Sequence, residues 1–171
     1  LKVSFENITN HIYFDNQGLP QQHAGNIQVL AADLQLNITT PWVNLDNSVV
    51  YQHSSSEYIP LPALTLYNNL YYHGTWVKAL DVQIGVDMRL FTKYYAPVLN
   101  PALGQFCVQQ VEKVGNYPVM NVYANFYVKH IRLKLFAQYQ HFNASFMNKQ
   151  YFAMPGYPMA PDMFRAGLSW H

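Results

Sequence analysis

Residues 80–93 read LDVQIGVDMRLFTK, and apolar and polar side chains alternate along almost the whole segment. One set of alternate positions is apolar: Leu80, Val82, Ile84, Val86, Met88 and Leu90. The other set is mainly polar or charged: Asp81, Gln83, Asp87, Arg89 and Lys93. Because successive side chains of a strand point to opposite faces, the pattern predicts a strand with one apolar face and one charged face.

The same alternation recurs along the chain. It runs through residues 1–6, 30–38, 43–52, 120–128, 131–140 and 164–171, and more weakly through residues 63–73. Asn68 interrupts the weak segment, and Asn47 breaks the apolar face of residues 43–52. The sequence therefore predicts about eight strands, and several of them have the roughly 9–11 residues that cross a bilayer.

The composition points in the same direction. Only 11% of the 171 residues are charged, against about 25% in average soluble domains, while 16% are aromatic. No run of about 18 apolar residues occurs, which excludes a transmembrane helix. Alternating apolar and polar residues cancel in any window, so we expect an all-β fold, an antiparallel up-and-down transmembrane β-barrel.

The connections between the expected strands alternate in length. Short turns are expected near Thr40 and Pro41, near Gly74, and at Lys129 and His130. The last of these is expected to contain two residues, because the apolar phase ends at Val128 and restarts at Ile131. Long links are expected near residues 17–25, 54–62, 95–118 and 143–161. Bacterial barrels have short periplasmic turns and long external loops, so this order favours such a barrel.

Aromatic residues are expected to form two interface belts. Trp42, Trp76 and Trp170 fall in or beside the short turns or at the end of the last strand. Tyr51 and Tyr139 fall toward the opposite ends of their strands. Trp and Tyr are enriched at both membrane–water interfaces, so these five residues are the predicted belt.

The two faces of the strands receive different roles. The predicted lipid-facing residues are Leu80, Val82, Ile84, Val86, Met88, Leu90, Val122, Phe126, Val128, Ile131, Leu133, Leu135 and Leu168. The predicted pore-lining residues are Asp81, Gln83, Asp87, Arg89, Lys93, Asn121, Asn125, Arg132, Lys134, Gln138, Gln140 and Arg165. Cations outnumber carboxylates in this lining set, which predicts a mild preference for anionic or neutral solutes. The alternative is a narrow interior in which these residues pair with one another.

No constellation for catalysis, cofactor binding or metal binding stands out. The seven His do not form metal-ligand spacings, and neither a Gly-x-Ser-x-Gly elbow nor a Gly-rich phosphate loop occurs. The net charge of +1 without a basic cluster argues against nucleic acid as a partner. We therefore expect that the protein is not an enzyme and has no cofactor and no metal site.

The link over residues 94–118 is expected either to fold inward as a constriction or to contact a ligand outside.

Five stretches carry a resemblance to a known family. They are LPALTLYNNLYY (61–72), ALDVQIGVDMRLFTKYYAPVLNPALGQF (79–106), GNYPVMNVYANFYVKHIRLKLFAQYQHFN (115–143), YFAMPGYPMAPDMFRAGLSW (151–170) and, more weakly, HIYFDNQGLPQQ (11–22). Together they resemble the putative porin family of Bacteroidetes outer membranes. The resemblance implies an outer-membrane barrel in which residues 1–171 are one segment, the C-terminal strands of a longer chain. Such barrels usually end in an aromatic residue, whereas His171 follows Trp170 here.

The leading functional prediction is a porin-like channel for passive diffusion of small solutes across the bacterial outer membrane. Its expected partners are the lipid bilayer, the barrel-assembly machinery and small solutes, and the sequence does not predict an oligomeric state. One alternative is a plugged structural or adhesive barrel whose long loops bind a partner. The other is a soluble β-barrel that binds a small ligand, although its surface would then carry little charge for solubility.

Overall fold

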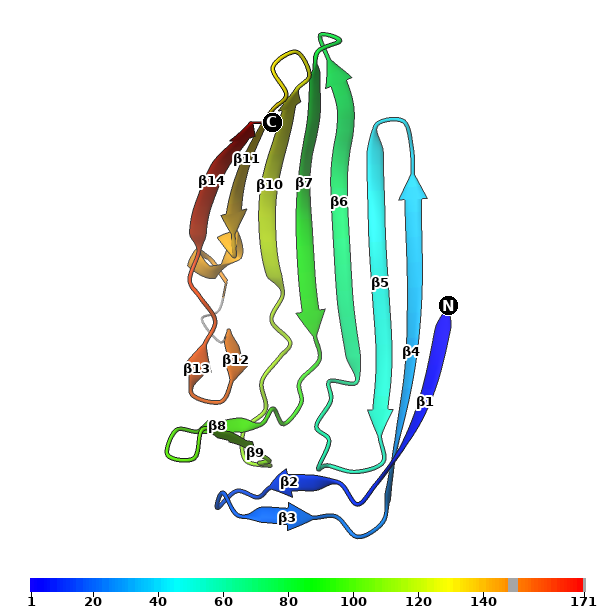
Figure 1. The fold of residues 1–171 in the computed structure, drawn as a ribbon, viewed down its shortest axis with the longest axis vertical. Helices are drawn as coiled ribbons and strands as arrows, with labels where there is room; N and C mark the ends of the chain where they lie inside the picture. Colours follow the sequence, from blue (N-terminus) through cyan, green and yellow to red (C-terminus); the bar gives the residue numbers. More distant parts are fainter. Residues whose placement is uncertain (148–150, 171) are drawn as a thin grey trace.

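The computed structural model describes residues 1–147 and 151–170. Eight long strands form one antiparallel sheet in which each strand pairs with the next along the chain (Figure 1). In order across the sheet they are β1 (Lys2–Thr9), β4 (Asn26–Thr39), β5 (Val43–Ser54), β6 (Leu64–Trp76), β7 (Leu80–Phe91), β10 (Val119–Val128), β11 (Leu133–Gln140) and β14 (Met163–Trp170). The all-β antiparallel prediction is confirmed. The sheet is open, with β1 and β14 at its two edges, so the closed barrel is not seen.

Short strands lie in the long links. A four-stranded sheet contains β3 (Pro20–Gln22), β2 (Ile12–Phe14), β9 (Gln105–Cys107) and β8 (Val98–Asn100), in that order. A separate hairpin pairs β12 (Phe152–Met154) with β13 (Tyr157–Pro158), and η1 (Phe142–Ser145) is a single 3-10 turn. None of the helical segments described has the length and hydrophobicity needed to cross a membrane.

Long and short connections alternate as the sequence predicts. The long links, residues 10–25, 55–63, 92–118 and the described parts of 141–162, gather at one end of the large sheet, at the bottom of Figure 1. The short turns, residues 40–42, 77–79 and 129–132, lie at the other end. We call these the long-link end and the short-turn end. This arrangement follows directly from an antiparallel meander, because every second connection lies at the same end.

Two turn predictions are wrong in detail. Val128 pairs with Leu133, so the turn between β10 and β11 has four residues, not two. Ile131 and Arg132 therefore lie in the turn and not in a strand, and Arg132 has a φ of 52°. Gly74 lies inside β6, and the turn falls at Val77 and Lys78, whose φ values of 51° and 57° give it the twist of a hairpin turn.

The large sheet has no apolar core. Apolar residues that share one face remain exposed, including Leu34 at 51%, Leu36 at 56% and Leu168 at 70%. On the opposite face Asp87 is only 8% exposed and Asn44 only 7%. Most of the buried apolar side chains described, such as Ala96, Cys107 and Val114, lie instead in the long links. A soluble sheet would bury its apolar face, so this burial pattern is inverted.

Three glycines in the long strands allow an aromatic ring to lie across the sheet. A Cβ on Gly85 would lie 2.7 Å from the Tyr123 ring, and one on Gly167 would lie 2.6 Å from the Phe136 ring. On the apolar face, a Cβ on Gly74 would lie close to the Tyr72 hydroxyl. Each ring covers backbone that a strand glycine leaves bare. The Gly85–Tyr123 and Gly167–Phe136 contacts join neighbouring strands and help to fix their register, whereas Tyr72 and Gly74 lie on the same strand.

Candidate pore-lining face

The register of the large sheet places polar residues in rows that run across the strands. Asn37, Asp46, Asn69, Asp87 and Asn121 are successive cross-strand partners on β4, β5, β6, β7 and β10. We call these five residues the amide–carboxylate row. Every member is an amide or a carboxylate, so the row presents donors and acceptors across the middle of one face.

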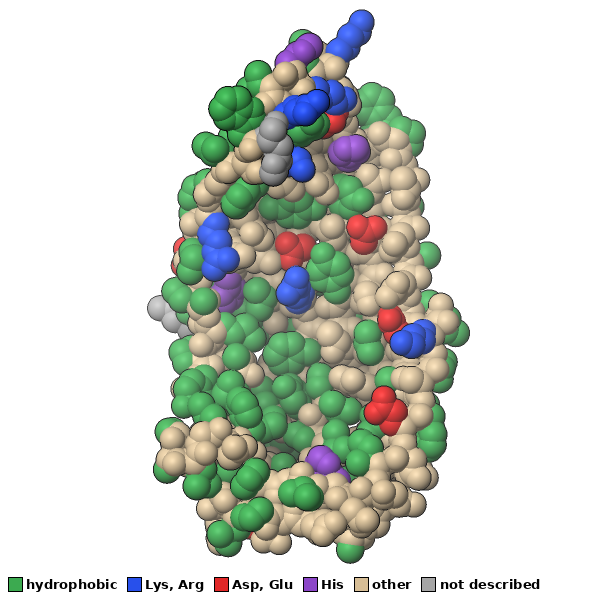
Figure 2. Space-filling model, in the orientation of Figure 1, with side chains coloured by type: hydrophobic (Ala, Val, Ile, Leu, Met, Phe, Trp, Pro, Cys, Tyr) green, Lys and Arg blue, Asp and Glu red, His purple; other side chains and the backbone are tan. Residues whose placement is uncertain are grey.

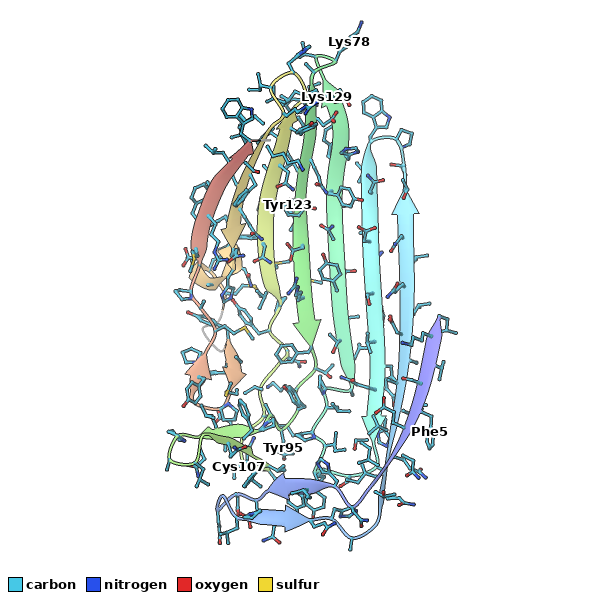
Figure 3. The ribbon with its side chains drawn as sticks, in the orientation of Figure 1. Phe5, Lys78, Tyr95, Cys107, Tyr123 and Lys129 are labelled. Atoms are coloured by element: carbon cyan, nitrogen blue, oxygen red, sulfur yellow. The ribbon has the colours of Figure 1, made fainter. Side chains whose placement is uncertain are left out.

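Several bonds hold the row in place. Asn121 donates through Nδ2 to Asp87 Oδ1 at 2.8 Å, and its own Oδ1 accepts the His141 backbone N–H at 2.9 Å. Tyr123 donates its hydroxyl to Asn69 Oδ1 at 2.9 Å. Figure 3 labels Tyr123 near the middle of the sheet, well away from the turns. These bonds fix side-chain orientation along the row.

Aromatic and cationic side chains flank the row. Tyr71, Gly85 and Tyr123 form the adjacent row on one side, and Tyr67 and Arg89 pair across strands on the other. The Arg89 guanidinium lies 5.5 Å from the centroid of the Tyr67 ring. Such a contact holds the cation over the ring face and leaves its edges free for other partners.

One acceptor near the short-turn end is left without a protein partner. Among the described side chains, the Asn44 Oδ1 atom is buried and accepts no hydrogen bond. A buried acceptor is costly unless it has a partner. An ordered water on this polar face would supply one.

Ten of the twelve predicted pore-lining residues share this face. They are Asp81, Gln83, Asp87, Arg89, Asn121, Asn125, Lys134, Gln138, Gln140 and Arg165. Lys93 lies in the link after β7, and Arg132 lies in the turn before β11, so their expected strand positions are wrong. We call the face that carries these ten residues the polar face. That it lines a pore stays a prediction.

The predicted excess of cations is not found among the strand residues of this face. Register adds three acidic residues that were not among the predicted lining residues, because Glu6, Asp33 and Asp46 lie on the same side. The strand carboxylates of the face are Glu6, Asp33, Asp46, Asp81 and Asp87, and its strand cations are Lys2, Arg89, Lys134 and Arg165. Figure 2 shows both signs of charge on the sheet, with hydrophobic side chains more prominent toward the long-link end.

The predicted lipid-facing residues gather on the opposite face. Those in strands are Leu80, Val82, Ile84, Val86, Met88, Leu90, Val122, Phe126, Val128, Leu133, Leu135 and Leu168. Ile131 lies in the turn instead. Val82 differs from its neighbours because it is 0% exposed: it pairs with Gly74, over which Tyr72 lies, and with Phe126. Whether this face meets lipid stays a prediction.

The predicted belt residues lie toward the two ends of the sheet. Trp42 is in the first short turn, Trp76 ends β6 and Trp170 ends β14, all at the short-turn end. Tyr51 and Tyr139 lie toward the long-link end of β5 and β11. All five side chains are at least 39% exposed, as contact with an interface requires.

The long-link end is held together by polar contacts that the sequence did not reveal. Asn143 is fully buried, and its Oδ1 accepts the Met120 backbone N–H at 3.0 Å. Its Nδ2 donates to the Pro118 carbonyl oxygen at 2.7 Å and to the Tyr117 hydroxyl at 3.1 Å. His141 Nε2 lies 2.9 Å from the same hydroxyl, and burial raises the pKa of Tyr117. The fourth long link is thereby tied to the third.

The first and third links also meet. Phe14 on β2 pairs in parallel with Cys107 on β9, which joins two links from distant parts of the large sheet. Cys107 is 1% exposed. Figure 1 shows the resulting small sheet lying across the long-link end. The third link therefore contacts the first link. From the sequence, the third link was expected to form a constriction or to contact an external ligand, and neither expectation included this contact.

Among the described residues, no group of three or more His, Cys, Asp or Glu side chains is placed to hold a metal ion.

The fold and the two faces of the sheet together define an amphipathic antiparallel β-meander with an exposed apolar face. A family model described as putative porin matches residues 1–171, and the chain belongs to this family. The match confirms the family that the sequence resembles. No curated protein and no solved structure matches the chain.

Proposed function

We propose that this chain contributes strands to an outer-membrane pore through which small polar solutes diffuse passively. In this proposal the large sheet is one section of a closed barrel, and strands outside residues 1–171 complete it. The polar face lines the water-filled passage, and the apolar face contacts the bilayer. Membership of a putative porin family supports both the location and the role.

One observation carries the proposal. The apolar face is the exposed face, with Ile84 at 40%, Leu70 at 50% and Leu168 at 70%, while Asp87 on the polar face is 8% exposed. A sheet of this kind is stable where hydrocarbon covers its apolar side and water covers its polar side. Closure also removes the unpaired backbone groups at the edges formed by β1 and β14.

The partners follow from this arrangement. The lipid bilayer covers the apolar face, small solutes contact the polar face, and assembly machinery inserts the strands. The mixed charge of the polar face supports passage of neutral and weakly charged solutes better than strong selection for one sign. The proposal includes no catalytic step and no cofactor.

Solute flux tests the proposal. The full-length protein is reconstituted into liposomes, which are then diluted into isotonic solutions of small sugars and amino acids. A pore admits the solute, so swelling should be faster than in protein-free liposomes and should slow as solute size increases. Liposomes that contain correctly folded protein and remain sealed would contradict the proposal.

A second candidate is a plugged barrel whose long links bind a partner. The small sheet across the long-link end favours it, because β2, β3, β8 and β9 cover part of that end. Deletion of residues 98–107 separates the two candidates. A plug predicts that sealed liposomes become permeable after the deletion, whereas an open pore predicts flux both before and after it.

A further inference from the structure

The polar face contains a hollow near the short-turn end. Its volume is about 420 Å³, and its lining includes His73, Gln83, Asn125, Tyr127 and Phe136. The hollow spans two adjacent rows of the register. One row contains His73, Gln83, Asn125 and Phe136, and the other contains Asp81, Tyr127 and Lys134. The volume lies in the range of small-molecule sites, at its lower end.

Phe136 stands out among the polar-face residues of this hollow because its ring carries no polar group, unlike that of Tyr127. It pairs with Asn125 on β10 and with Gly167 on β14. A Cβ added to Gly167 would lie 2.6 Å from Phe136 Cε1 and 2.7 Å from Cζ, so the ring lies over the glycine. Phe136 remains 48% exposed. One side of the ring therefore covers β14, and the other remains open to the hollow.

Amide groups stand beside this ring. Asn125 Nδ2 donates to Gln83 Oε1 at 3.3 Å, which leaves the Asn125 oxygen and the Gln83 nitrogen available to a ligand. His73 extends the same row and adds a ring nitrogen to it. The hollow thus combines an open aromatic surface with amide groups that both donate and accept hydrogen bonds.

The carboxylate beside the hollow has partners within the protein. Lys129 Nζ lies 2.8 Å from Asp81 Oδ1, and Thr75 donates its hydroxyl to the same oxygen at 2.6 Å. Lys134 Nζ lies 5.9 Å from the centroid of the Tyr127 ring. Because the Asp81 carboxylate already has a cationic partner, it does not favour a bound cation, and the amides beside the open ring favour an uncharged ligand.

We propose that this hollow is a binding subsite for a neutral pyranose sugar, with Phe136 as the stacking platform. A pyranose ring has a face of C–H bonds that packs on an aromatic ring, and its rim of hydroxyls both donates and accepts hydrogen bonds. Asn125, Gln83 and His73 meet the hydroxyls, and Phe136 meets the C–H face. The inference rests on the proposed pore, and it names the class of solute that binds transiently to the polar face.

Binding is measured separately from transport. The full-length protein in detergent micelles is titrated with maltose and observed by saturation-transfer NMR. Sorbitol serves as the comparison, because it has hydroxyls but no ring with a C–H face. The proposal predicts that saturation reaches the ring protons of maltose and that sorbitol binds at least about threefold more weakly.

Three variants locate the binding. Phe136→Leu removes the aromatic surface and should weaken maltose binding about threefold to tenfold. Gly167→Ala keeps the ring but displaces it, because the new Cβ would overlap Phe136, and it should also weaken binding. Phe164→Leu, on the apolar face of β14, is the control and should leave binding unchanged.

The outcomes separate this inference from the proposed pore. Equal binding of maltose and sorbitol, or an unchanged dissociation constant in both Phe136→Leu and Gly167→Ala, overturns the subsite even if solutes cross the liposomes. Sealed liposomes overturn the pore even if maltose binds in micelles. If Phe136→Leu fails to fold, Gly167→Ala decides the question, because only the flexible ring must move to accommodate it.

Discussion

The ring of Tyr123 on β10 lies across Gly85 on β7, and its hydroxyl reaches Asn69 on β6. A single side chain thus connects three neighbouring strands on the polar face. The ring fits only because position 85 has no Cβ, which would lie 2.7 Å from both the ring and the Cβ of Tyr71. This contact places a tyrosine on the polar face without displacing the amide–carboxylate row.

Replacing this glycine should destabilise the sheet. Gly85→Ala overlaps the Tyr71 Cβ, which cannot move without its strand, and the free energy of unfolding should fall by about 1–3 kcal/mol. Gly167→Ala is the matched control, because its Cβ meets only the Phe136 ring, and its loss should be smaller. Urea unfolding in detergent measures both. An equal loss in the two variants would show that the rigid Tyr71 contact has no special cost.

Ion selectivity should respond to the charge of the polar face. Lys134 lies on that face of β11, whereas Arg132 lies in the turn outside the strand. Lys134→Glu should raise cation preference, because it adds negative charge along the passage. Arg132→Glu makes the same change in charge at the rim, where solvent screens it, and should have a smaller effect. Reversal potentials in planar bilayers provide the measurement, and a larger shift from Arg132→Glu would contradict the assignment.

The turn between β2 and β3 should depend on the ionisation of Asp15. The carboxylate accepts the backbone N–H groups of Leu19 and Gln17, each at 2.9 Å, and these bonds, the one from Leu19 foremost, lower the pKa of Asp15. A lowered pKa means that the contribution to stability is complete above the ordinary carboxyl pKa. It is lost as pH falls through the lower pKa of the folded state.

An NMR pH titration checks this directly. The amide shifts of Gln17 and Leu19 should change together, with a midpoint below the ordinary value of about 3.9 for an aspartate. Asp15→Asn is the control and should abolish that transition. A midpoint at or above the ordinary value would show that the turn does not stabilise the charged form.

Asn143 should be important for the long-link end. It is fully buried and bonds Met120, Tyr117 and Pro118. Asn143→Ala leaves these groups unpaired, which costs about 1–3 kcal/mol for a buried partner. Asn16→Ala, at an exposed position, is the comparison. We expect faster proteolysis of residues 141–162 in Asn143→Ala alone, and equal rates in the two variants would count against a structural role for the network.

The large sheet was largely predictable from the sequence because its alternation is regular. Every second position from Leu80 to Leu90 is apolar. Because a strand has only two faces, this pattern determines which residues share a face. Chain order then predicted pairing, since short turns require antiparallel neighbours. The turn at residues 129–132 was predicted to be too short. Ile131 is apolar and fits the alternation as the first apolar position of the next strand, whereas it lies in the turn.

Features that depend on contacts distant in sequence could not be predicted. The pairing of Phe14 with Cys107 joins links more than 90 residues apart, without a local signal. Asp33 and Asp46 had the right alternation, but their assignment to the polar face required the register of β4 and β5. Phe136 was not among the predicted lining residues, and it is apolar in an otherwise polar series. A glycine on the neighbouring strand, Gly167, is the signal that could have identified its position.

The orientation of the two faces is tested most directly at Val86 and Asp87. These neighbours on β7 point to opposite faces and are 39% and 8% exposed. Each is changed to Cys in a Cys107→Ser background, spin-labelled and reconstituted in liposomes. The label at position 86 should relax with oxygen, which concentrates in hydrocarbon, and the label at position 87 with a water-soluble nickel chelate. The reverse pattern, with position 86 in water and position 87 in lipid, would contradict the account.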